Sequence, residues 1–493
     1  MPKLIIDNLG RGGISLSDRE GIEGSYSYGL QVNPNIILGY LTPGNKLTTP
    51  TGSSVLGARI RKAIVDPQNA KIYALEEGRR LHRADSDVGN LATTGDYPHA
   101  IGTTNSSVAG QDLIIYSFNS TNYLLYSWKD SGGGDVGRVN LTGTISFDDT
   151  YLSLTVNNTS SLSGTNEESF QFLEWQKNGM LYVSDGRAVH KIDNSTFKGT
   201  LTKNNFRLPV GWMITSLFDA NEFIGICGIY LPGNTYTGRR SRSMVVFWDG
   251  VSTQFTRKVL VPDPEIRASY NLNGEFYIWC KSAFAKGVLR QWDGNHFVKI
   301  TDIINGNDTN YPINDFGQID EWKNQLLWQT DGRLFTYGSP QIGYPKALNQ
   351  IGKTTGTGDG GVVVSSGGTI YAGSLTGTTY YWESFASGAD TGFLWKSMFY
   401  EFPQKIKINY VKVEFQTTAS GVDDDIKLEL DYGNSTTTLG NINTSGLEYK
   451  SFNFRGNHCN NFRIHIDTDE TSSTAGIFYS RIIVDYDFVE GDF

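Results

Sequence analysis

The chain has 493 residues and a formal net charge of −9, with 51 acidic against 42 basic residues. An acidic balance without a dense Lys/Arg segment argues against specific binding to nucleic acid. The longest apolar runs fall short of a membrane-spanning helix, and the opening MPKLIIDNLGRGG lacks the apolar core of a secretion signal, so we expect no membrane span and folding in the cytoplasm.

The composition predicts an all-β protein. Glycine (56) far outnumbers proline (14), 13% of the residues are aromatic, and the glycines cluster at turns between apolar runs. No long segment combines a helical period with capping residues. The three cysteines, Cys227, Cys280 and Cys459, are odd in number and lack a CxxC spacing, so a disulfide framework is not expected.

Residues 1–58 form a region that does not repeat. It contains many glycines and prolines between short apolar stretches. This composition predicts an extended N-terminal arm with turns that lies on another surface. Such an arm could close a ring of repeats or bind a neighbouring molecule.

Residues 59–387 repeat a pattern of a short turn between two runs of β-branched and aromatic residues, seven times over. The spacing is that of four-stranded blades, which need roughly 40 to 50 residues each, so we predict a seven-bladed β-propeller. One interval is too long, and we interpret about 132–168, rich in Gly, Ser, Thr and Asn, as an insertion. The first turns of the seven copies are placed at Asn69, Gln111, Asn178, Asn221, Asn273, Asn324 and Gly367.

Residues 388–493 change to long strands with strict alternation of apolar and polar residues. The clearest are 405–417, 425–433, 461–468 and 476–488. Alternation over several strands indicates a sheet with one buried and one solvent-exposed face, which predicts a C-terminal β-sandwich. We expect its first residues, 393–397, to pack the sandwich against the propeller.

Several motifs imitate ligand sites. Ala347–Thr354 fits a loose phosphate-loop pattern, but the helix that such a loop needs is missing. For the same reason, the glycines of 356–361 are not interpreted as a nucleotide-binding GxGxxG motif. His458 and His465 are the one histidine pair near ligand spacing, and their seven-residue separation places them on opposite faces of a strand. Asp423 to Asp425 reads as a hairpin turn rather than a calcium site.

Propellers often carry glycosidase carboxylates at their axis. Here Asp185, Asp249, Asp293 and Asp331 recur, but each precedes a glycine, and Asp-Gly is the preferred pair of a type I′ hairpin turn. Turn formation therefore explains them better than catalysis. We predict that the chain is not an enzyme, with no catalytic, cofactor-binding or metal-binding residues and no cofactor.

Two segments resemble a known family. The opening LGRGGISLSDREGIEGSYSYGLQVNP, with Gly12, Gly13 and Ile14, resembles the start of tailed-phage virion proteins that carry a propeller. The stretch WKSMFYEFPQKIKINYVKVEFQT, 395–417, resembles tail-nozzle and tail-stabilisation proteins. The resemblance implies a mechanical role in which propeller, arm and sandwich pack into a ring around the DNA channel, with no catalytic residues to carry over. The chain departs from the family in ending with one simple sandwich.

The sequence thus predicts a non-enzymatic structural protein of a tailed-phage particle, in the tail or the head–tail connection. Its expected partners are other virion proteins and further copies of itself in a ring; its expected location is the virion tail. One alternative is a receptor- or glycan-binding tail module that binds a host-surface glycan on aromatic rings such as Trp382 or Trp395. A glycan-cleaving propeller is the other, and release of reducing ends would reveal it.

Overall fold

The computed structural model confirms the all-β fold. It describes residues 2–15, 19, 21, 23–30, 32–34, 40–48, 56–84, 97–102, 109–130, 133–153, 170–192, 201–230, 242–282, 287–302, 318–330, 332–356, 358–389, 393–417, 423–444, 446–456, 458–468 and 477–489. Across these ranges no helix is long and apolar enough to cross a membrane.

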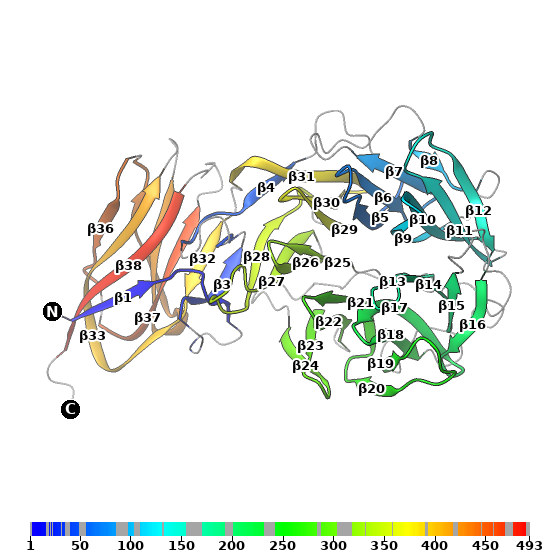
Figure 1. Cartoon of the computed structure of the whole chain (residues 1–493). Coiled ribbons are helices and arrows are strands. Elements are labelled where there is room, and N and C mark those ends of the chain that lie inside the picture. The colour runs from blue at the N-terminus through cyan, green and yellow to red at the C-terminus, as the bar shows by residue number, and fades with distance from the viewer. Residues whose placement is uncertain are drawn as a thin grey trace.

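Seven four-stranded antiparallel sheets form the propeller, arranged around a common axis in Figure 1. The first three blades are β5–β8 (Ile60–Val65, Ile72–Glu76, Arg80–Ala84, His99–Ala100), β9–β12 (Ala109–Phe118, Thr121–Asp130, Gly133–Asn140, Phe147–Ser153) and β13–β16 (Phe172–Trp175, Met180–Asp185, Ala188–Ile192, Leu201–Arg207).

The next three blades are β17–β20 (Trp212–Ala220, Phe223–Tyr230, Arg242–Trp248, Arg257–Val261), β21–β24 (Glu265–Leu272, Glu275–Lys281, Gly287–Trp292, Phe297–Asp302) and β25–β28 (Ile319–Trp322, Gln325–Thr330, Arg333–Gly338, Ala347–Lys353). The seventh blade contains β29 (Gly358–Ser366), β30 (Thr369–Thr376) and β31 (Thr379–Ala389).

An N-terminal strand closes the ring. β4 (Asn45–Thr48) pairs antiparallel with β31 and becomes the fourth strand of the seventh blade, as expected of the arm. Leu47 of β4 is fully buried beside Leu327 of the sixth blade and Val363 of the seventh. The first and last parts of the propeller are therefore joined by hydrogen bonds and by shared apolar contacts.

The hairpin turns explain why the repeat could be recognised. Asn221, Asn273 and Asn324 have positive φ angles of 61°, 53° and 62°, a conformation that asparagine tolerates better than most residues. Gln111 was misplaced. It lies within β9, and the corresponding turn is formed by Asn119 and Ser120, also with positive φ.

The expected insertion at 132–168 is wrong for its first half. Residues 133–140 and 147–153 are β11 and β12, the third and outermost strands of the second blade. Outer strands face solvent along one edge, so their composition approaches that of a loop, and the sequence pattern therefore predicts an insertion there. Residues 154–168 lie outside the described part of the chain.

The C-terminal module is one curled sheet of ten strands, whose two halves pack face to face. Its strands are β1 (Lys3–Asp7), β2 (Gly13–Ile14), β3 (Ser25–Leu30), β32 (Leu394–Ser397), β33 (Tyr400–Thr417), β34 (Asp424–Leu430), β35 (Ser435–Ile442), β36 (Tyr449–Asn453), β37 (Cys459–Thr468) and β38 (Ile477–Phe488), with one turn of 3₁₀ helix at Asp431–Gly433.

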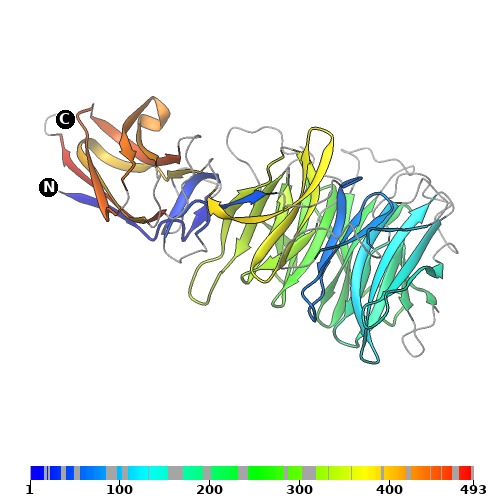
Figure 2. The same cartoon turned by 90° about the horizontal axis from the view of Figure 1, so that it is seen from above.

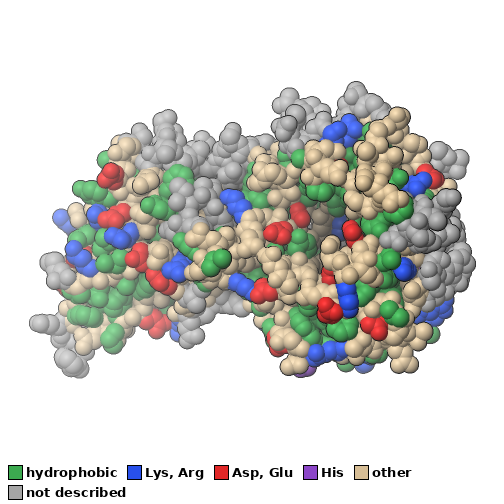
Figure 3. All heavy atoms as spheres, viewed as in Figure 1, with side chains coloured by type: hydrophobic (Ala, Val, Ile, Leu, Met, Phe, Trp, Pro, Cys, Tyr) green, Lys and Arg blue, Asp and Glu red, His purple; other side chains and the backbone are tan. Residues whose placement is uncertain are grey.

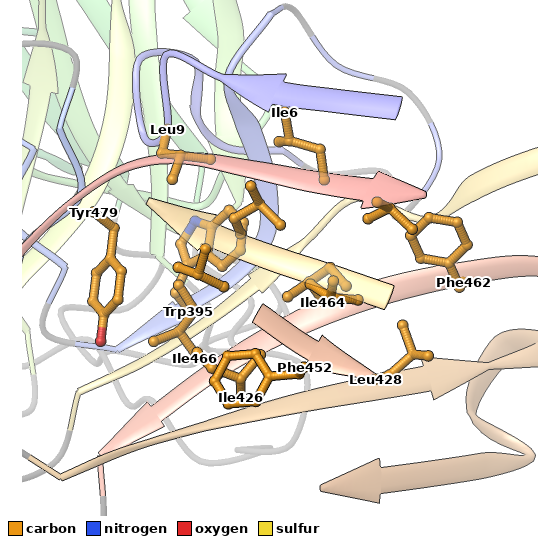
Figure 4. Close-up of a cluster of buried hydrophobic side chains, with 14 of the residues drawn as sticks. Ile6, Leu9, Trp395, Ile426, Leu428, Phe452, Phe462, Ile464, Ile466 and Tyr479 are labelled. Atoms are coloured by element: carbon orange, nitrogen blue, oxygen red, sulfur yellow. The ribbon is translucent and has the colours of Figure 1, made fainter. Parts of the chain in front are cut away.

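The long strand β33 links the two halves of this sheet. Its first part pairs with β37 and its second part with β38, and alternate side chains such as Val411 and Val413 point into the core. The facing half supplies Ile426, Ile464 and Ile466, all fully buried (Figure 4).

Both ends of the described chain meet in this module. Lys3 pairs with Asp485 and Asp7 with Arg481, and β1 and β38 lie together at the end away from the propeller in Figure 2. The N-terminal segment is extended, as expected, and it lies along both modules of its own chain: β1, β2 and β3 belong to the C-terminal sheet and β4 belongs to the propeller.

Candidate functional site

Charged side chains gather around the axis of the propeller. Figure 3 shows acidic and basic groups around a hollow at its centre. Inner strands surround this axis, because the first strand of each blade is the innermost one. The cluster is therefore built by residues from different blades, which only closure of the ring brings together.

Lys62 and Asp112 form the first part of this axial cluster. The Lys62 ammonium on β5 lies 3.3 Å from Asp112 Oδ1 on β9. The buried Asp112 carboxylate also accepts the amide N–H of Phe172 at the start of β13, at 2.7 Å. One carboxylate thus connects three successive blades.

Asp320 forms the second part. Its carboxylate on β25 accepts the Ser365 amide N–H of β29 at 2.7 Å. Burial raises the pKa of Asp320 to about 6, against the opposing effects of the Ser365 and Glu321 amides and of the Lys62 charge. Burial, together with Asp320 and Glu321, also raises the pKa of Tyr270 above its usual range. Asp320 is thus a carboxyl group that can exchange a proton near neutral pH.

Gln318 crosses the ring between blades that are not neighbours. Its side-chain amide donates to the Ala63 carbonyl at 2.7 Å and accepts from the Ala63 N–H at 3.0 Å, which joins the sixth blade to the first. Next to it, Arg61 donates to the backbone carbonyl of Gln111 at 3.2 Å and to its side chain at 3.3 Å. These bonds use side chains of the inner strands to hold the ring closed.

A second polar feature repeats inside the blades. His82 Nε2 lies 2.8 Å from Glu76 Oε1 in the first blade, and His190 Nε2 lies 3.4 Å from Asp185 Oδ2 in the third. All four side chains are buried. In each case the acid ends the second strand and the histidine lies on the third. The sequence analysis did not predict these pairs, because the acid precedes the histidine by six residues in one copy and by five in the other.

The Asp-Gly turns are explained only in part by turn chemistry. Asp249 accepts the amides of Val251 and Ser252, and Asp293 accepts those of Asn295 and His296, as turn residues do. Asp185 differs, because its side chain is fully buried against His190. Asp331 lies outside the described residues.

The other sequence motifs lie apart from the axis. Ala347–Lys353 is strand β28, so the phosphate-loop pattern has no helix behind it. His465 is buried beside Glu429, whereas His458 is exposed. Asp424 and Asp425 begin β34 instead of forming a turn, and Asp424 accepts a hydrogen bond from the Tyr479 hydroxyl. Among the described residues, no group of His, Cys, Asp and Glu could hold a metal ion.

The two modules meet along a polar seam between the N-terminal segment and β28. The buried Tyr26 hydroxyl donates to Asn349 Oδ1 at 2.7 Å, and the Val32 N–H donates to the Gln350 carbonyl at 2.8 Å. Gly13, with φ +66°, fits here because a Cβ atom would lie 2.6 Å from the Leu348 carbonyl oxygen. The Gly-Gly-Ile motif of the opening is thus a point of close backbone approach.

No family model and no curated protein matches this chain. Among solved structures, Raptor from Chaetomium thermophilum is similar at 10% identity and a TM-score of 0.46, over 70% of this chain and 29% of that chain. A glycoside hydrolase family 43 arabinoxylan arabinofuranohydrolase from Bacillus subtilis is similar at 10% identity and a TM-score of 0.34, over 88% of this chain and 96% of that chain. Similarities this remote bring no substrate, partner or activity to this chain.

Proposed function

We propose that this chain is a non-enzymatic structural component of a tailed-phage particle, in the tail or the head–tail connection, that acts through protein interfaces and assembles into a ring. The observation that carries the proposal is the seam. The N-terminal segment pairs with the C-terminal sheet, bonds to β28 and closes the seventh blade. Two β modules are thereby joined along their contact, which suits a part that must transmit force.

The chemistry of the axis agrees with a structural role. Asp112 accepts two backbone amides and faces Lys62, and Asp320 accepts the Ser365 amide. Carboxylates that are satisfied by backbone donors hold strands in place. The Asp112 and Asp320 carboxylates therefore stabilise the closed ring of blades.

Two exposed apolar side chains on the propeller could contact a partner subunit. Leu260 on β20 and Val298 on β24 are 63% and 40% exposed, on the outermost strands of neighbouring blades. Arg257 on β20 connects the two blades, because its guanidinium donates to the Gly294 and Asn295 carbonyls, in the turn before β24, at 2.8 and 3.1 Å. Exposed apolar side chains on unpaired strand edges are typical of protein interfaces.

Quantitative peptide mass spectrometry of purified particles tests the location. We expect a fixed copy number per particle, small relative to the major capsid protein. Absence from the particles would contradict the proposal and leave a cellular binding protein or enzyme.

Native mass spectrometry of the purified chain tests the interface. The double variant Leu260→Asp/Val298→Asp should lower the oligomer fraction, while Ile342→Asp, at an exposed position on the sixth blade, should not. A strictly monomeric wild-type chain that also fails to enter particles would overturn ring assembly.

Glycan stacking on Trp382 or Trp395 is not supported. The two rings are 0% and 1% exposed, so neither presents a face to a sugar. Trp382 lies in the core between the first and seventh blades, and Trp395 in the core of the C-terminal sheet.

A further inference from the structure

One edge of strand β1 is unpaired within the described part of the chain. β1 pairs with β38 on one side only, and it lies at the end of the strand order of its sheet. The Tyr486 N–H donates to the Pro2 carbonyl at 3.3 Å. Hydrogen-bonded pairs alternate along an antiparallel ladder, so Leu4 and Ile6 also bond to β38. The backbone groups of the alternate residues point toward the open edge, and these residues are Lys3, Ile5 and Asp7.

This edge is open to solvent. Ile5, at its middle, is 54% exposed. Beside it, a cavity of about 280 Å³ lies between residues 5–7 and side chains such as Glu23 and Met398. β1 is also at the end of the molecule away from the propeller (Figure 1), so the propeller leaves room for a large partner. A further strand, which would lie about 4.8 Å from β1, can therefore approach the edge.

The charges of the β1 edge have no partner in their own chain. The strand reads KLIID, with Leu4 and Ile6 facing the core and the other three side chains on the outer face. Asp485 and Arg481 lie opposite its two ends on β38, but Asp485 bonds to Asn409, and Arg481 lies near Glu414. Neither charged residue of β1 forms an ion pair with a described residue.

The sequence of β1 is complementary to itself. When two copies pair antiparallel about a twofold axis at Ile5, Lys3 of each copy lies opposite Asp7 of the other. Leu4 lies opposite Ile6, so the apolar face of the sheet continues across the axis. The three outward-facing residue pairs are of the hydrogen-bonded kind, and each exchanges two backbone hydrogen bonds. A shift of the register in either direction would separate the opposite charges.

Strand β36 provides a comparison, because it pairs with β33 alone. The Phe415 N–H donates to the Glu448 carbonyl, so alternate residues of β36 face outward. These residues are Tyr449, Ser451 and Asn453, and none is charged. Charges on edge strands usually prevent pairing between molecules, since like charges then meet. On β1 the two opposite charges stand at the spacing that favours pairing instead.

We infer that β1 is an interaction surface for a second copy of this chain, and that the two β1 strands pair antiparallel to form a twofold dimer with one continuous sheet. The inference does not depend on the structural role proposed above. It also uses a surface of the C-terminal module, distinct from Leu260 and Val298 of the propeller.

The experiment is sedimentation equilibrium of the full chain, with its purification tag at the C-terminus, in the Leu260→Asp/Val298→Asp background. A dimer should persist there, and a monomer at all concentrations would overturn the inference. Asp7→Lys brings like charges together at both ends of the paired strands and should raise the dissociation constant about tenfold or more. Lys3→Asp/Asp7→Lys exchanges the charges and should return the dissociation constant to that of the parent. A double variant as weak as Asp7→Lys would contradict the pairing.

A proline substitution tests the backbone bonds. Ile5→Pro removes an N–H that points to the open edge and leaves the bonds to β38 in place, so it should weaken the dimer. Ser451→Pro is the matched control, because it removes an outward N–H from β36 and should leave the dimer unchanged. Loss of the dimer in Ser451→Pro but not in Ile5→Pro would place the interface at β36 and overturn the inference.

Discussion

The propeller and the C-terminal module are both antiparallel β structures, but they are stabilised over different sequence distances. Within the propeller, nearly all strand pairs are neighbours along the chain, and the apolar residues form separate clusters between adjacent blades. The C-terminal module has one core, which joins Ile6 to Val484 and Tyr26 to Trp395. The same secondary structure can thus arise from local repetition or from pairing between the ends of a chain.

Three buried thiols allow the two modules to be followed separately. Cys227 and Cys280 lie in the fourth and fifth blades and Cys459 lies on β37, and none forms a disulfide. Burial raises the pKa of Cys227 and of Cys459 to about 12 and that of Cys280 well above its usual value. Alkylation therefore requires opening of the module, and peptide mapping identifies which one opened.

The largest effect is expected from the buried ion pair of the fifth blade. Arg290 Nε lies 2.5 Å from Asp263 Oδ2, with both side chains about 10% exposed. Asp263→Ala leaves the guanidinium buried without its partner and should lower the free energy of unfolding by about 3–5 kcal/mol. Cys227 and Cys280 should be alkylated faster, and Cys459 should not.

The double variant Asp263→Leu/Arg290→Met is the control for that experiment, since it removes both charges and should recover most of the stability. If Cys459 were alkylated as fast as the propeller thiols, the two modules would unfold as one unit and the comparison would not hold.

The next effect concerns the closure of the ring. Leu47→Ala removes a fully buried side chain from β4 and should cost about 2–5 kcal/mol. Although β4 is N-terminal, loss of the Leu47 side chain should expose the propeller thiols first, because Leu47 packs between the sixth and seventh blades. Preferential alkylation of Cys459 would show that β4 stabilises the C-terminal module instead of the propeller.

A pH dependence is expected from Asp320. Its pKa is about 6 in the folded chain and about 4 in an unfolded one, so the charged form is disfavoured by folding. The free-energy cost of burying the charged Asp320 carboxylate is fully present above pH 6 and disappears as the pH falls from 6 toward 4. Asp320→Asn should therefore raise the free energy of unfolding at pH 7 by about 2–3 kcal/mol.

The difference between Asp320→Asn and wild type should shrink steadily between pH 6 and pH 4 in urea unfolding experiments. A difference that stays constant with pH would mean that Asp320 is charged at the same pH in both states. Other carboxyl groups titrate in this range too, and the comparison with the variant cancels their contribution.

The smallest effect should come from the seam. Tyr26→Phe removes the hydroxyl that donates to Asn349 and should cost about 1–2 kcal/mol. In a double-mutant cycle with Asn349→Ala, a coupling energy above about 0.5 kcal/mol would demonstrate the bond between the modules. Strictly additive effects would mean that the two side chains stabilise their own modules only.

The repeat was recognisable because its signals are local. Asn273 with Gly274 and Gly367 with Gly368 adopt positive φ at the turns, and apolar runs flank them. The second copy was placed wrongly at Gln111, which lies within β9, whereas its turn is formed by Asn119 and Ser120. The number of blades was thus predictable from the sequence, whereas the exact position of each repeat depended on recognising one turn.

The N-terminal pairings and the axial cluster could not be read from the sequence. Lys3 meets Asp485, and Gln318 meets Ala63, only after the whole fold has formed. The burial of Trp395 depends on its packing against Ile6 and Leu9, which no local pattern encodes. Contacts at these distances follow from topology alone.

The placement of β4 and β1 has a consequence during synthesis on the ribosome. β4 is made before any other propeller strand, yet its partner β31 is made last among them, and β1 must wait for β38. Both strands are left with unpaired backbone groups until most of the chain has emerged. A good yield of folded protein therefore requires that a chaperone or transient non-native contacts protect these groups in the meantime. A nascent chain arrested before residue 379 would display an open ring, and its tendency to associate with other nascent chains should exceed that of the finished protein.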